Sequence, residues 1–67
     1  MFIVIEVQAT ESTAQTLVNS YADRNAAESK YHEILKYASV SKVPIHSATM
    51  ITAEGYYLKS EVYVHGE

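Results

Sequence analysis

The chain contains no cysteine and no tryptophan, and only one proline and two glycines among its 67 residues. The lack of cysteine excludes disulfide bridges and thiolate metal sites and agrees with a reducing cytoplasm, which we predict as its location. A domain this short buries only about 60% of the surface that its unfolded chain exposes. Because disulfides are excluded, we expect oligomerisation to supply the missing stability. We therefore predict one small domain, residues 1–67.

Basic residues are also few. Five Lys and Arg stand against eight Asp and Glu, which gives a formal net charge of -3. Binding to a phosphate backbone needs clustered positive charge, whereas these five are scattered, so we predict no binding to long nucleic acid. One small anionic ligand would need only one or two of them. The opening MFIVIEVQ has no basic flank and too short an apolar run for a signal peptide or a membrane span, so we predict no membrane association.

The order of elements can be predicted from hydrophobic periodicity. FIVIEVQA (residues 2–9) and QTLVNSYA (15–22) have strand character and flank a polar turn, TEST. Residues 23–42 predict the one helix, with Asn25 as N-cap before Glu28, or Asp23 as a second candidate. One apolar stripe on that helix consists of Ala27, Tyr31, Ile34, Leu35 and Ala38. Pro44 requires the helix to end before it.

The remaining stretch, VPIHSATMITAEGYYLKSEVYVHGE, predicts a second hairpin around AEG, because Gly55 can adopt a positive φ. With Glu54 and Gly55 as a two-residue turn, Ile51 pairs with Leu58 and His46 pairs with Tyr63. A four-residue loop of the same parity would keep the two faces separate as well, whereas a three-residue loop would mix them. The fold class is therefore α+β, in the order β-β-α-β-β. It has a four-stranded, mainly antiparallel sheet with the helix packed on one face.

Strand alternation divides the sheet residues into an aliphatic face and a mixed face. We expect the helix to cover the aliphatic residues, namely Ile3, Ile5, Val7, Ile45, Ile51, Leu58, Val62 and Val64. The face left uncovered would then carry Phe2, Val4, Glu6, His46, Met50, Tyr57, Lys59, Glu61, Tyr63 and His65. Exposed patches of large apolar groups usually mark an interface or a binding groove.

His46 is the residue of this predicted surface with the most varied chemistry. It neighbours Tyr63 directly and His65 diagonally, whereas Ser47 points to the opposite face and cannot form a nucleophile–base pair with it. We predict a contact residue, no catalytic residue and no metal site, since the spacing of His46, Glu61 and His65 matches no short zinc motif. The predicted ligand or interface residues are His46, Met50, Tyr57, Lys59, Glu61, Tyr63, His65, Phe2 and Val4.

As an overall pattern, FIVIEVQ, AAESKYH, VSKVPIHSATM and EGYYLKSEVYVHGE resemble small, mostly uncharacterised proteins from phages and conjugative elements of Gram-positive bacteria. The resemblance spans nearly the whole chain and contains no mechanistic motif. It implies an accessory protein of a mobile element, of the kind that binds a host defence protein or sequesters a defence signal molecule.

The function predicted from sequence is a non-enzymatic, homo-oligomeric binding protein without a cofactor. Its partners would be a second copy of itself and either a small anionic ligand, such as a signalling nucleotide, or a host protein. One alternative is a purely structural interaction module. Another is a small tautomerase-like enzyme that uses His46 and Tyr63, although such tautomerases depend on a proline directly after Met1, where this chain has Phe2.

Overall fold

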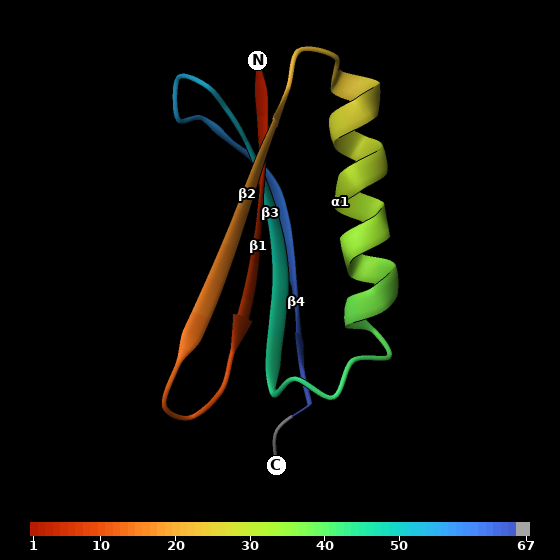
Figure 1. Ribbon diagram of the computed structural model, residues 1–67. Coiled ribbons are helices and arrows are strands. Elements are labelled where there is room, and N and C mark those ends of the chain that lie inside the picture. The colour runs from red at the N-terminus through yellow and green to blue at the C-terminus, as the bar shows by residue number, and fades with distance from the viewer. Residues whose placement is uncertain (66–67) are drawn as a thin grey trace.

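The computed structural model describes residues 1–65, and the last two residues of the predicted domain lie outside that range. Its elements are β1 (Phe2–Ala9), β2 (Ala14–Tyr21), α1 (Arg24–Ala38), β3 (Ile45–Thr52) and β4 (Tyr57–Val64). The strands form one antiparallel sheet in the order β2-β1-β3-β4. Figure 1 shows this sheet nearly edge-on, with α1 lying along one side of it. The predicted α+β fold is confirmed.

The N-cap of helix α1 is Asp23, the second candidate, rather than the preferred candidate, Asn25. The Asp23 side chain accepts a hydrogen bond from the Ala26 amide at 3.2 Å, which satisfies one of the free amides of the first turn. The helix ends at Ala38, well before Pro44, and the Ser39 amide donates to the Leu35 carbonyl. The predicted apolar stripe is confirmed, since four of its five residues are buried and Leu35 packs against them.

The side of the sheet that α1 covers is the opposite of the predicted one. Val4, Ala48 and Met50 are fully buried beneath the helix, and His46 is only 4% exposed. We call this side the helix face. The aliphatic residues that were expected beneath α1 lie instead on the other side, with the exception of Leu58, which packs against the core. We call that other side the open face.

The width of one helix explains how a mixed face can hold the core. A helix with its side chains is about 10–12 Å across, whereas four strands about 4.8 Å apart span nearly twice that. Helix α1 therefore covers mainly the two central strands, where Val4, Ala48 and Met50 lie. The outer strands can keep polar side chains on this face, such as Asn19 and Lys59, because these reach the solvent beside the helix.

The β3–β4 hairpin agrees with the predicted register over most of its length. The pairs from Ile45–Val64 to Met50–Lys59 are confirmed. The turn is one residue longer than predicted, because the Thr52 amide donates to the Tyr56 carbonyl, and Gly55 takes φ 97° between them. Leu58 is the extra residue of a β-bulge, so Ile51 pairs with Tyr57 instead. The bulge restores the alternation that a three-residue loop would have disturbed.

Candidate functional site

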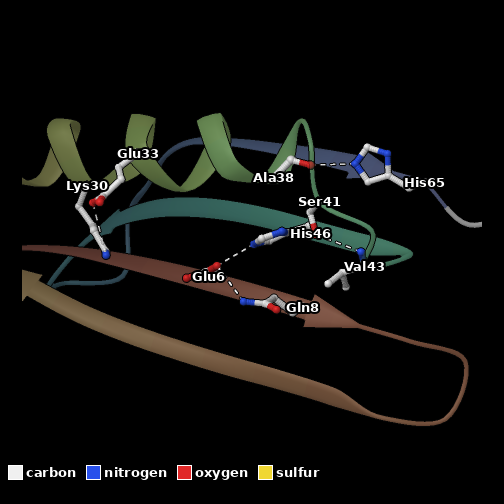
Figure 2. A network of polar contacts seen from close by, with 9 residues as sticks. All are labelled: Glu6, Gln8, Lys30, Glu33, Ala38, Ser41, Val43, His46 and His65. Carbon is white, nitrogen blue, oxygen red and sulfur yellow. Dashed lines mark hydrogen bonds and ion pairs between the residues drawn. The ribbon is translucent and has the colours of Figure 1, made fainter.

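His46 lies in a buried polar network beneath the last turns of α1, and Figure 2 shows its ring directed at Glu6 on the neighbouring strand. The Nε2 atom lies 2.6 Å from Glu6 Oε2, and the Gln8 side-chain amide donates to the same oxygen at 3.0 Å. A carboxylate accepts hydrogen bonds, so His46 donates this bond in the tautomer that carries its proton on Nε2. The strand pairing explains why these three side chains are close together. Gln8 on β1 lies opposite His46 on β3, and Glu6, two residues from Gln8, points to the same face of the sheet.

The other ring nitrogen of His46, Nδ1, is buried without a hydrogen-bond partner. In the neutral ring this atom is an acceptor, so the cost is that of one unsatisfied acceptor rather than of a buried unpaired charge. A general base has to come within hydrogen-bond reach of its substrate. An imidazole enclosed by the helix and the sheet has no such access, so its position fits a structural role.

Glu28 is the centre of a second polar cluster, between α1 and β4. Lys59 Nζ donates to its carboxylate at 2.9 Å and also lies 5.4 Å from the centre of the Tyr31 ring. The Lys59 hydrogen bond, aided by Arg24 Nε at 3.5 Å, lowers the pKa of Glu28. Burial, together with the negative charges of Glu61 and Glu28, raises the pKa of Tyr31. Lys59, predicted as a ligand contact, thus connects the helix to the sheet.

The other predicted site residues are distributed around the helix face and do not form one surface. Val4 and Met50 belong to the core, and Phe2 packs against it. Tyr63 lies opposite His46 as predicted, and its ring stacks on His65, whose Nε2 donates to the Ala38 carbonyl at 2.8 Å. Glu61 is exposed beside the helix. Of the nine predicted residues, only Tyr57 pairs with an open-face residue, Ile51.

The open face is the most unusual surface of the protein. Its four rows, read across β2, β1, β3 and β4, are Ser20–Ile3–Ile51–Tyr57, Val18–Ile5–Thr49–Ser60, Thr16–Val7–Ser47–Val62 and Ala14–Ala9–Ile45–Val64. None of these residues is buried and none is charged. The charged residues of the described strands, Glu6, Lys59 and Glu61, all lie on the helix face. Among the elements of residues 1–65, Figure 1 shows no helix or further strand over the open side of the sheet.

Sequence reasoning assigned the two faces correctly as sets, apart from Tyr57 and Leu58, which the bulge exchanges, and it reversed the roles of the faces. The signal that identifies the open face is charge, because strand alternation places every charged strand residue on one side. The uncharged face extends over all four strands, and one helix cannot cover that width. The sequence alone therefore showed that the one predicted helix is too narrow for this face.

Comparison of the chain with family models, with curated proteins and with solved structures finds no match. The resemblance to proteins of phages and conjugative elements therefore remains a prediction. Within residues 1–65, no three His, Asp or Glu side chains gather closely enough to hold a metal ion. The described residues contain one helix, α1, which is too short and too polar to cross a membrane.

Proposed function

We propose that the protein is a non-enzymatic binding protein that acts as a homo-oligomer, with its open face as the contact between two copies. The observation that carries the proposal is that this face is uncharged across all four strands although none of its residues is buried in the single chain. Isolated exposed apolar residues are normal, but a contiguous patch usually marks an interaction site.

The extent of the open face suits a second sheet. Four strands of eight residues, at a spacing of about 4.8 Å and a rise of about 3.3 Å, have a flat footprint of roughly 500 Å². The accessible area of a surface covered with side chains exceeds its flat footprint, and standard interfaces bury about 800 Å² on each partner. Two sheets pack face to face with their strands about 30° apart, so a second copy could cover all four strands.

A second copy also fits chemically. In a two-fold contact each residue meets residues of the same surface, so a face charged with one sign would oppose like charges. The open face carries only aliphatic side chains, hydroxyl groups and the phenol of Tyr57. A core as small as Val4, Ala27, Tyr31, Ile34, Ala48 and Met50 benefits from the additional burial.

Binding rather than catalysis is supported by the position of the one residue that suggested chemistry. His46 is enclosed and engaged by Glu6. Among partners beyond the second copy, a host protein is favoured over a small anionic ligand. The cation predicted to contact such a ligand, Lys59, is engaged by Glu28 instead.

Light scattering coupled to size exclusion, at micromolar concentration, tests the contact. Val62 lies on the open face and is 53% exposed, whereas Val40 lies outside the sheet and is 76% exposed. We expect a dimer or larger assembly for the wild type, a lower mass for Val62→Glu, and the wild-type mass for the matched Val40→Glu. Circular dichroism establishes that each variant is folded. A monomeric wild type, or a folded Val62→Glu of unchanged mass, would overturn the proposal.

A further inference from the structure

Strand β2 forms one edge of the sheet and has none of the features that normally protect an edge. Exposed edge strands usually carry charges, proline or a bulge that prevents pairing with another chain. The opposite edge, β4, has Lys59, Glu61 and the bulge at Leu58. In contrast, β2 has the sequence AQTLVNSY, which contains no charge and no proline, and it pairs with β1 in unbroken register over eight residues.

Strand β2 is also exposed on both faces. Seven of its eight residues are exposed, and Tyr21 alone is half-buried. Leu17 is 42% exposed although it lies on the helix face, because α1 covers mainly the central strands. The strand therefore offers a full row of backbone groups with apolar side chains on either side.

The backbone groups available at this edge follow from the hairpin geometry. The Thr10 amide donates to the Thr13 carbonyl at 2.8 Å, which fixes the start of the β1–β2 ladder. Hydrogen-bonded and non-hydrogen-bonded pairs then alternate along an antiparallel ladder. Pairs such as Gln8–Gln15 and Glu6–Leu17 are therefore hydrogen-bonded. It follows that the amides and carbonyls of Thr16, Val18 and Ser20 point away from the sheet.

We infer that the β2 edge pairs with β2 of a second copy, in antiparallel orientation, to give a continuous eight-stranded sheet. In antiparallel pairing of identical strands about a two-fold axis, a residue at the axis faces its own copy, and β2 carries no charge at its centre or elsewhere. The two apolar residues Leu17 and Val18 lie at the middle of the strand. A central axis therefore brings these residues together, with the polar side chains on either side of them.

The geometry of such a pair is restricted. Residues directly opposite in an antiparallel ladder point to the same face, so the axis passes at a residue such as Leu17 or Val18 and stands perpendicular to the sheet. Both α1 helices then lie on the same side, one on each half of the joined sheet. The two open faces also become one continuous surface. Combined with the open-face contact, which rests on the proposed function, edge pairing predicts a tetramer of two eight-stranded sheets.

Blocking a single backbone amide tests the edge without changing any side chain. A chain of 67 residues is accessible to chemical synthesis, and N-methylation of Val18 removes one outward amide while leaving the ladder to β1 intact. The matched control is N-methylation of Val62, whose amide points outward at the β4 edge by the same alternation. We expect the N-methyl-Val18 protein to have half the wild-type mass, and the N-methyl-Val62 protein to keep the full mass.

Hydrogen exchange gives an independent readout. In the wild type we expect slow exchange at the amides of Thr16, Val18 and Ser20, which point away from every acceptor of their own chain within residues 1–65. We expect rapid exchange at Thr16 and Ser20 in N-methyl-Val18, and at all three amides in Leu17→Lys. Rapid exchange at these amides in the wild type, or an unchanged mass for N-methyl-Val18, would overturn the inference. The open-face proposal is read separately from Val62→Glu. An edge effect without a Val62→Glu effect rejects the open-face contact alone, and the converse rejects the edge contact alone.

Discussion

His46 Nε2 lies 2.6 Å from Glu6 Oε2 on the side of the sheet that α1 covers. Truncating the ring removes one of the two hydrogen bonds that the half-buried Glu6 carboxylate accepts, a bond to a charged group worth about 1.5–3 kcal/mol, and it leaves a cavity. We predict that His46→Ala lowers the free energy of unfolding by about 3 kcal/mol, as measured by chemical denaturation. A loss below about 1 kcal/mol, typical of a surface substitution, would contradict the buried position of this residue.

Replacing both members of the pair is expected to be milder. In the double variant Glu6→Met/His46→Leu, neither member of the pair is left without the other, and only the half-buried Gln8 amide loses its acceptor. Well-packed apolar replacements of buried pairs are often neutral. We predict that its loss of stability is clearly smaller than the sum for the two single variants, which a double-mutant cycle measures. Additive losses would mean that the two side chains do not interact energetically.

The assignment of the two faces can be tested with one type of substitution. Val4 is fully buried beneath α1, whereas Val62 lies on the open face. Truncating Val4 to Ala removes buried carbon worth about 0.8 kcal/mol per methylene and leaves a cavity, so we expect a loss of about 2 kcal/mol that does not depend on protein concentration. Val62→Ala should instead reduce stability by an amount that varies with protein concentration, because oligomer stability follows mass action. The reverse pattern in denaturation at two protein concentrations would support the face predicted from sequence.

Much of this fold follows from local sequence patterns. Strand alternation, the helix stripe around Tyr31 and Ile34, and the pairing of His46 with Tyr63 are local or nearly local properties, and each was predicted. The choice of the face that α1 covers depends on a non-local balance. The helix carries Glu28 at the border of its stripe, and Lys59, which pairs with Glu28, is available only on the mixed face. Hydrophobicity alone favoured the aliphatic face as the one that α1 covers. That argument leaves out a second copy of the chain, which could cover the aliphatic face instead.

The Glu28–Lys59 hydrogen bond predicts a specific dependence of stability on acid. Because this bond lowers the pKa of Glu28 in the folded protein, the unfolded chain binds the proton first as pH falls. The stabilisation is present above the unfolded pKa and is lost as pH falls through the folded pKa. We predict that Lys59→Met loses less stability than the wild type between about pH 6 and pH 3. Lys42→Met, which removes an exposed positive charge elsewhere, is the control and should retain the wild-type slope.

The buried phenol of Tyr31 predicts a loss of stability at alkaline pH. Burial, with the negative charge of Glu61, raises its pKa in the folded protein. Above about pH 10 the unfolded chain therefore loses this proton while the folded chain keeps it. The unfolded state then binds fewer protons, so stability falls as pH rises from there to the folded pKa. Tyr31→Phe should flatten this alkaline loss. Tyr37→Phe, on the exposed side of the same helix, is the matched control for the loss of a phenol from α1. If Tyr31→Phe and the wild type lost stability in parallel above pH 10, Tyr31 would not keep its proton in the folded state.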